Sequence, residues 1–144
     1  EFVAPPDRIT PLFAYHPTVR RIYLAGRSPP AALADTESAQ WMGHSIGRWE
    51  GDTLVIDTVG FNGNTWLDMA GHPASDQLHV IERYSRPNFG NLMNHITIED
   101  PVMYSKPWDI RMNTPILDDG NSELMEYICT ENERDAKHLD NLKK

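Results

Sequence analysis

Apolar and polar residues alternate along much of this chain with the two-residue period of a β-strand. The alternation is clearest in residues 106–114, where an apolar side chain stands at every second position from Trp108 to Met112. One face of such a strand is apolar, so we expect it to cover a core. Other runs rich in β-branched and aromatic residues predict further strands. They lie at residues 11–15, 19–24, 41–49, 53–61, 77–86, 92–99 and 123–130.

Short turns separate most of these strands. Glu50-Gly51-Asp52 lies between two of them and predicts a hairpin, because glycine adopts the positive φ that tight turns require. Residues 88–91 predict another turn. Residues 62–76 instead form a long connection rich in Gly, Asn and Asp. Loops of this length in compact domains are functional or disordered as a rule, and Trp66 and Leu67 favour packing over disorder.

About eight strands joined by turns predict an all-β fold, an antiparallel meander. A meander of this size must hide its edges, so we expect a barrel or a barrel-like sandwich, lipocalin-like in outline. We predict a single β domain over residues 1–144, with the strands in 8–130 and a short charged C-terminal tail in 131–144. A barrel of about eight strands can hold one small ligand, and the 62–76 loop would lie near its opening.

Composition narrows the classes of partner. The chain has 144 residues, 40% of them hydrophobic, and a formal net charge of −8 at pH 7. Negative charge argues against nucleic-acid binding, because phosphates require a basic patch that Arg20 and Arg21 alone do not make. No apolar run approaches the ~20 residues that cross a bilayer, so we expect no membrane insertion. The single cysteine, Cys129, has no activating neighbour in the sequence and is expected to pack in the core.

Several sequence blocks resemble a large family of uncharacterised bacterial proteins that are frequent in soil and environmental (metagenome) sequence. The blocks are Gly43-His-Ser-Ile-Gly-Arg-Trp-Glu-Gly-Asp-Thr-Leu-Val-Ile-Asp-Thr58, Thr65-Trp-Leu-Asp68, Gly71-His-Pro73, Leu78-His79 with Glu82-Arg83, Glu99-Asp-Pro101 and Lys106-Pro-Trp108. The resemblance implies export, hence a periplasmic or secreted protein whose signal peptide has been removed, and it carries no assigned activity. It also implies a further N-terminal segment. Without that segment a sheet edge would be exposed, and a homodimer could form through it.

The loop and the strand after it carry the first candidate site. His72, Asp76 and His79 fall within eight residues, and imidazole and carboxylate are groups used for acid–base catalysis or for binding metals. The spacing is not that of a standard metal motif, so no metal and no cofactor is predicted. The alternative is structural, with Asp76 capping a turn and the histidines bonded to backbone.

Carboxylates on apolar strand faces form the second candidate set. Asp57, Glu82 and Glu126 each share a strand face with apolar neighbours. Inside a barrel, desolvation would raise the pKa of such a carboxyl group into the range useful for proton transfer. The alternative is that these faces point outward, or that each carboxylate meets an arginine such as Arg48, Arg83 or Arg111.

Aromatic residues form the third set. A ligand-binding wall is predicted from six side chains, with core packing as the alternative for those in strands and Trp66 as a lid over the pocket. They are Trp41, Trp49, Trp66, Trp108, Tyr84 and Tyr104, and Asp68 beside Trp66 is a further candidate ligand-binding residue. Gly43-His-Ser45-Ile-Gly47 matches the G-x-S-x-G pattern only superficially, because that nucleophile site needs a strand, a sharp turn and a helix.

Three functions follow from these sets. The first is binding of a small apolar or aromatic molecule in a barrel, near residues 62–79. The second is a cofactor-free isomerase, lyase or hydrolase, in which His72 or His79 is the base, Asp76 or Asp57 orients the imidazole, and Glu82 is an acid. The third is a structural or protein-interaction module that uses the outer sheet surface.

Overall fold

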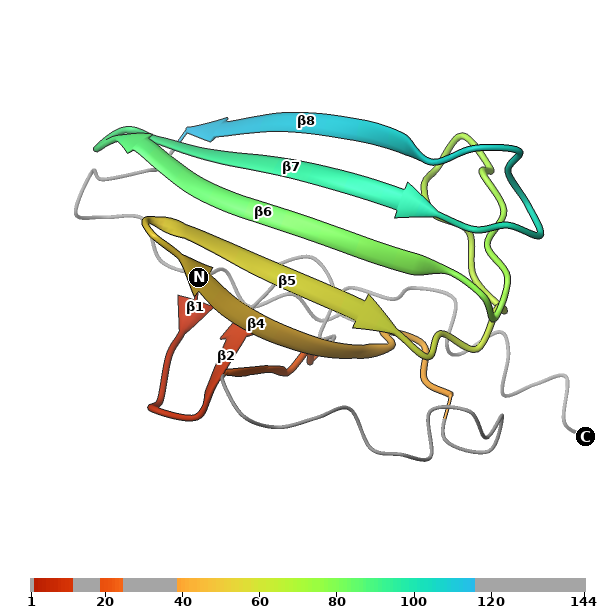
Figure 1. Ribbon diagram of the computed structural model, residues 1–144, viewed down its shortest axis with the longest axis horizontal. Helices are drawn as coiled ribbons and strands as arrows, with labels where there is room; N and C mark the ends of the chain where they lie inside the picture. The colour runs from red at the N-terminus through yellow and green to blue at the C-terminus, as the bar shows by residue number, and fades with distance from the viewer. Residues whose placement is uncertain (1, 12–18, 25–38, 116–144) are drawn as a thin grey trace, which may run out of the picture.

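The computed structural model describes residues 2–11, 19–24 and 39–115, and these residues form an all-β structure (Figure 1). Eight strands make one sheet, and their order in the sheet follows their order in the chain. The strands are β1 (Phe2–Val3), β2 (Arg8–Pro11), β3 (Ile22–Leu24), β4 (His44–Glu50), β5 (Thr53–Val59), β6 (His79–Asn88), β7 (Asn91–Glu99) and β8 (Trp108–Pro115). The predicted meander of about eight strands is confirmed.

Neighbouring strands are antiparallel except for one pair. Strands β3 and β4 run parallel, with Ile22 opposite Ser45 and Leu24 opposite Gly47. A tight hairpin can join only antiparallel strands, so the meander is interrupted once, between these two strands. The sequence pattern predicted both strands within an antiparallel meander, and the parallel pairing is the one departure from it, because a two-residue period is the same in either direction.

The hairpin at Glu50-Gly51-Asp52 is confirmed. Trp49 pairs with Leu54 across it, and Gly51 has a φ of 60°, in the left-handed region that glycine adopts without steric cost. The β6–β7 hairpin turns at Phe89 and Gly90, with a register shift between Ser85 and Asn88. The predicted strands at 11–15 and 123–130, Cys129 and the 131–144 tail lie wholly or largely outside the described residues.

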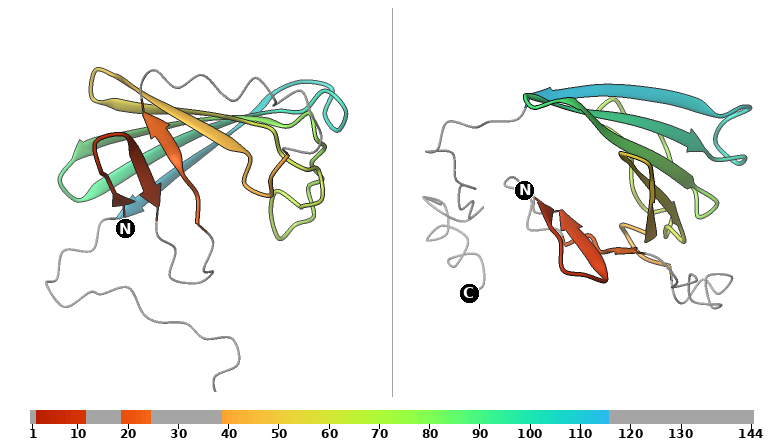
Figure 2. Two further views of the ribbon diagram at one scale, coloured as in Figure 1. Left: turned by 90° about the horizontal axis from the view of Figure 1, so that it is seen from below. Right: turned by 60° about the vertical axis from the view of Figure 1, so that its left-hand side comes forward.

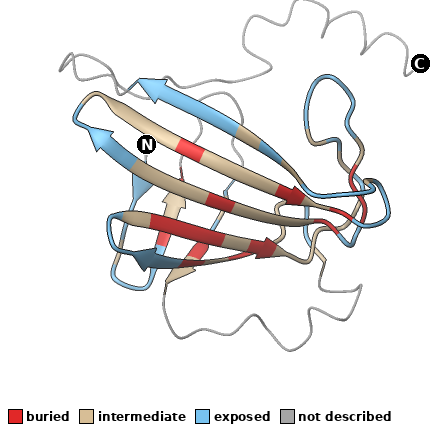
Figure 3. Cartoon of the chain, turned by 45° about the horizontal axis from the view of Figure 1, so that its top comes forward, coloured by how far each residue is buried: buried red, intermediate tan, exposed pale blue. Residues whose placement is uncertain are grey.

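The sheet curls into a half-barrel (Figure 2). Strand twist produces this curl, which carries β1–β3 round to face the inner side of β5. The first apolar cluster packs Ile9 and Ile22 against Leu54 and Ile56. The second cluster lies toward the other end of the sheet, where Leu78 and Ile98 are buried with Ala74 from the long loop. Figure 3 shows the buried positions gathered along β5 and its neighbours.

The described residues contain no helix that is long and apolar enough to cross a membrane. The long loop between β5 and β6 and the connection between β7 and β8 lie at the same end of the half-barrel (Figure 1). That end carries most of the candidate residues.

Gly47 brings β3 and β4 into close contact. A Cβ atom at this position would lie 2.9 Å from Ile22 Cγ2 and 3.0 Å from Leu24 Cδ2, both in the first apolar cluster. We expect Gly47→Ala to destabilise the fold by about 1–3 kcal/mol in urea unfolding, because overpacking forces the core to shift.

Gly90→Ala is the matched control. Its Cβ would have only Asn88 Oδ1 nearby, at 3.8 Å, and it should change stability by about 0.5 kcal/mol or less. Equal effects of the two variants would contradict the close packing at Gly47.

Candidate functional site

An open hollow of about 280 Å³ lies on the inner face of the half-barrel, against the long loop. Apolar side chains from β6, β7 and β8 make its wall, and loop residues make its rim. Its wall includes Leu78, Val80, Ile96, Ile98, Trp108 and Ile110, and its rim includes Trp41, Thr65, Trp66, Leu67 and Asp68. The fold therefore provides a concave, mostly apolar surface with a few polar groups, which is the usual composition of a small-molecule site.

A buried ion pair lies at the deep side of this hollow. Arg20 Nη2 donates to Glu82 Oε2, and the two side chains are only 12% and 8% exposed. Arg20 comes from the segment before β3, whereas Glu82 stands in the middle of β6. Each charge is neutralised by the opposite charge of its partner, as burial of an ionised side chain requires. Both residues contribute to the lining of the hollow.

Further hydrogen bonds are formed by the Arg20 guanidinium and by the other carboxylate oxygen of Glu82. Arg20 also donates from Nε to Ser45 Oγ (3.1 Å) and from Nη2 to Thr58 Oγ1 (2.9 Å), and those two hydroxyl oxygens lie 3.0 Å apart. Tyr84 donates its hydroxyl hydrogen to Glu82 Oε1 at 3.1 Å. Burial raises the pKa of Tyr84 well above its ordinary value, and the Glu82 carboxylate raises it further, so the phenol stays protonated as a donor. We call these five residues the inner polar network.

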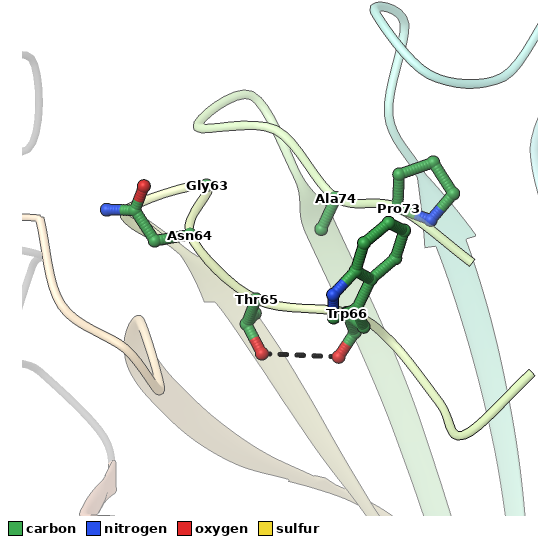
Figure 4. A pocket seen from close by; sticks show the side chains of 6 residues that line it. All are labelled: Gly63, Asn64, Thr65, Trp66, Pro73 and Ala74. Carbon is green, nitrogen blue, oxygen red and sulfur yellow. Dashed lines mark hydrogen bonds between the residues drawn. The ribbon is translucent and has the colours of Figure 1, made fainter. Parts of the chain in front are cut away.

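The long loop is folded back on itself at the rim. Trp66 pairs with Pro73 in an isolated antiparallel bridge, and Leu67 N donates to His72 O at 2.8 Å. Figure 4 shows Trp66 beside Pro73, where the loop also encloses a shallow outer depression of about 210 Å³. The same indole lines both this depression and the inner hollow. The loop is therefore folded back on itself by backbone pairing, although the side chain of Trp66, which was expected to pack, is largely exposed.

Asp68 organises the tip of the loop. Its Oδ1 accepts from Ala70 N (2.9 Å) and His72 N (3.3 Å), and its Oδ2 lies 2.6 Å from His72 Nδ1. Because an ionised carboxylate only accepts, the His72 hydrogen is assigned to Nδ1. The hydrogen bond from the His72 side chain lowers the pKa of Asp68 from its ordinary value. Asp68 is therefore ionised at neutral pH.

Aromatic rings connect the loop tip to the sheet. The ring centroids of His72 and Trp108 are 5.7 Å apart, and Tyr104 packs edge-to-face on Trp108 with a centroid separation of 5.6 Å. Tyr104 also donates its hydroxyl hydrogen to Pro73 O at 2.8 Å. Trp108 Nε1 is buried and has no hydrogen-bond partner within the described part of the chain. Trp108 therefore lies both beside the loop tip and in the lining of the hollow, whereas Tyr104 supports the loop.

Asp100 anchors the base of the loop to the β7–β8 connection. Its carboxylate is 2% exposed and accepts from Ser75 N (2.7 Å) and Ser75 Oγ (2.8 Å). It also accepts at 3.1 Å from the backbone N–H groups of Val102 and Met103. Burial alone would raise the pKa of Asp100, but the hydrogen bonds from Ser75, Met103 and Val102 outweigh it and lower the pKa below its ordinary value.

A second hollow of about 290 Å³ lies toward the other end of the half-barrel. It is lined mainly by apolar groups, including Phe2, Ile9, Trp49, Leu54, Tyr84 and Leu92. The six residues predicted to form one wall are therefore divided. Trp41, Trp66 and Trp108, together with Asp68, line the first hollow, Trp49 and Tyr84 line the second, and Tyr104 lines neither.

The predicted acid–base residues do not meet in either hollow. His79 lies on the outer face, where its Nε2 is 2.9 Å from Asp57 Oδ1 and its Nδ1 is 3.1 Å from Glu99 Oε2. His72 pairs with Asp68 instead of Asp76, which is exposed. Asp57 and His79 are thus paired as the enzyme hypothesis required, but they line neither hollow. Within the described ranges no three His, Cys, Asp or Glu side chains gather as a metal-binding group.

The three strand carboxylates also divide. Of the two alternatives left open for these residues, Glu82 faces the inside, and Asp57 faces outward because its strand presents Leu54, Ile56 and Thr58 to the inner face. Glu126 is outside the described residues. Glu82 does meet an arginine, but the partner is Arg20 rather than one of the three arginines predicted from strands.

Sequence reasoning missed Arg20 as a site residue and considered it only as part of a basic patch. The sequence did contain a signal, because Arg20 stands at the same alternate positions as Ile22 and Leu24, whose side chains face the core. Ser45 is not a nucleophile of the G-x-S-x-G type, because it lies within β4 and bonds to Arg20 and Thr58.

Comparisons with protein-family models, with curated proteins and with solved structures found no match to this chain.

Proposed function

We propose that this protein binds a small, largely apolar organic molecule in the hollow beside the long loop. One observation carries the proposal: an open apolar concavity ends at a buried, fully paired Arg20–Glu82 ion pair. Apolar wall area would supply most of the binding free energy, and the polar groups would orient the ligand. The volume of about 280 Å³ suits a ligand of modest size.

The cofactor-free enzyme hypothesis receives no support from the described residues. A general base must lie within hydrogen-bond reach of its substrate, beside a cavity that excludes water. His79 lies on the opposite side of the sheet from the hollow, bonded to two carboxylates. His72 bonds to Asp68 on one side and packs against Trp108 on the other.

Binding can be tested with N-phenyl-1-naphthylamine, a neutral dye whose emission rises in apolar surroundings. We expect the wild-type protein to bind it saturably. Trp66→Ala should weaken binding about fivefold, because one aromatic wall of the hollow is lost. The measurement is a dye titration followed by dye emission, so loss of tryptophan fluorescence does not interfere.

Trp49→Ala is the matched control. Trp49 and Trp66 are exposed to similar extents, 60% and 65%, but Trp49 lines the second hollow. Its replacement should change dye affinity less than about twofold. Weakening by Trp49→Ala alone would move the site to the second hollow, and failure of the wild type to bind neutral apolar probes would refute the proposed function.

A further inference from the structure

Two tryptophan side chains at the rim of the first hollow are largely exposed to solvent. Trp41 is 63% exposed and Trp66 is 65% exposed, and both line the same hollow. Trp41 lies just before β4, and Trp66 lies in the long loop. The face of an indole ring carries partial negative charge and attracts cations, most strongly those that are weakly hydrated.

A carboxylate stands in the same rim. Asp68 lines the hollow, and the loop holds it in place through Ala70 N, His72 N and the His72 ring. A carboxylate has about four acceptor positions, so these three contacts leave capacity for a cation. Asp68 is therefore an oriented negative charge in the lining of the hollow that the exposed Trp41 and Trp66 also line.

The deep side of the hollow does not offset this charge. Among the described residues of the lining, Arg20 is the cation, and Glu82 already neutralises it. Over these same described residues, Arg20 contributes a formal charge of +1 and Asp68 and Glu82 contribute −1 each, which leaves −1. The whole chain carries −8 at pH 7, so its long-range field also attracts cations and repels anions.

We propose that the hollow selects organic cations, with an alkylammonium group held at the rim by Asp68, Trp41 and Trp66 and an apolar body against Val80 and Ile110. The inference rests on the proposed binding function and adds the class of ligand. A compact inorganic cation would gain little here, because it would lose its hydration shell to an apolar wall. An anionic ligand would meet two carboxylates and an arginine that is already paired.

Three probes of nearly one shape separate charge from fit. Choline carries a trimethylammonium group, 3,3-dimethylbutan-1-ol is its neutral isostere, and 3,3-dimethylbutanoate is a similar anion. Each would be titrated against the protein by displacement of the dye and by shifts of backbone amide signals in NMR spectra. We expect the cation to bind about tenfold more tightly than the neutral alcohol, and the anion to bind most weakly.

Asp68→Asn tests the carboxylate. The amide oxygen can still accept from Ala70 N and His72 N, so the loop tip retains its backbone contacts. The ratio of cation to alcohol affinity should fall from about tenfold to about threefold or less. Asp76→Asn is the control in the same loop, exposed and outside the lining, and should leave the ratio unchanged.

Trp41→Leu provides a second variant that does not depend on the loop. It keeps an apolar side chain at the rim but removes the ring, and the affinity ratio should fall again. If dye binds and the alcohol equals the cation, the selectivity for cations is wrong and the binding function stands. If the wild type does not bind the neutral dye, the proposed function itself is wrong.

Discussion

Replacing Arg20 with methionine is expected to destabilise the fold by about 3–5 kcal/mol, because it leaves Glu82 as an unpaired charge in the interior. Arg20 donates to Ser45, Thr58 and Glu82, which lie on β4, β5 and β6, so the loss affects three strands at once. The measurement is urea unfolding at pH 7. The change should be seen in the midpoint rather than in the slope, since the area exposed on unfolding is nearly unchanged.

Removing both charges should be much less harmful than removing one. In the double variant Arg20→Met, Glu82→Leu, no unpaired charge remains, and Ser45 and Thr58 still bond to each other at 3.0 Å. Tyr84 loses its acceptor, which costs about 1 kcal/mol. We expect the double variant to lie within about 1–2 kcal/mol of the wild type, so the double-mutant cycle should show strong coupling.

Arg48→Met is the control for the first prediction. Arg48 pairs with Glu50 at 2.8 Å, but both side chains are 53% exposed, and solvent screens such a pair. Its loss should change stability by about 0.5 kcal/mol or less. An Arg20→Met effect as small as that of Arg48→Met would show that Glu82 is not confined to the interior.

Asp100→Ala is expected to give the second large loss of stability, about 3 kcal/mol in the free energy of unfolding. The backbone N–H and the hydroxyl group of Ser75 would lose a charged acceptor in a buried position. Val102 and Met103 lose theirs in the adjoining turn. Because Ala74 belongs to the second apolar cluster, the base of the long loop should loosen with it. Hydrogen exchange of the Ser75 amide would report that loosening.

The effect of Asp100 should depend on pH in a defined direction. Its pKa is lowered in the folded state, so its contribution is fully present above the unfolded-state pKa, near 4, and disappears as the pH falls through the lower folded-state value. The difference in unfolding free energy between the wild type and Asp100→Ala should therefore be largest at neutral pH and shrink below about pH 4.

Asp109→Ala, which removes an exposed acceptor of Thr97, is the control for Asp100 and should cost about 1 kcal/mol or less. If Asp100→Ala and Asp109→Ala are equally mild, or if the Asp100 effect grows as the pH falls, the account of Asp100 as a buried ionised anchor is wrong.

Local pattern was informative wherever one strand face is buried. The strands from β4 to β8 were expected within a few residues of their observed bounds, because alternation and turn residues act over short distances. The long loop was also expected at one end of the sheet, since a connection between two strands leaves the sheet where the first strand ends. The parallel pairing of β3 with β4 was not predictable, since strand direction depends on the path of the connecting chain.

The candidate site was only partly predictable. Trp66, Asp68 and Trp108 were expected to line a ligand site, and all three line one hollow. Trp66 and Asp68 lie in the long loop, and Trp108 lies on the strand that faces it. Asp57 and Glu82 were indistinguishable in sequence, as each stands among apolar neighbours. Asp57 faces outward to His79, and Glu82 faces inward to Arg20.

The sequence by itself determined the all-β class, the β4–β5 and β6–β7 hairpins, the long loop between β5 and β6 and the net negative charge, since these depend on local period, turn residues and composition. Only the tertiary structure decided which strand face lies inside and which residues share the hollow. Arg20 and Glu82 are 62 positions apart, and the curl of the sheet brings them together. Register and curl are set by packing of the whole sheet, so no local pattern contains them.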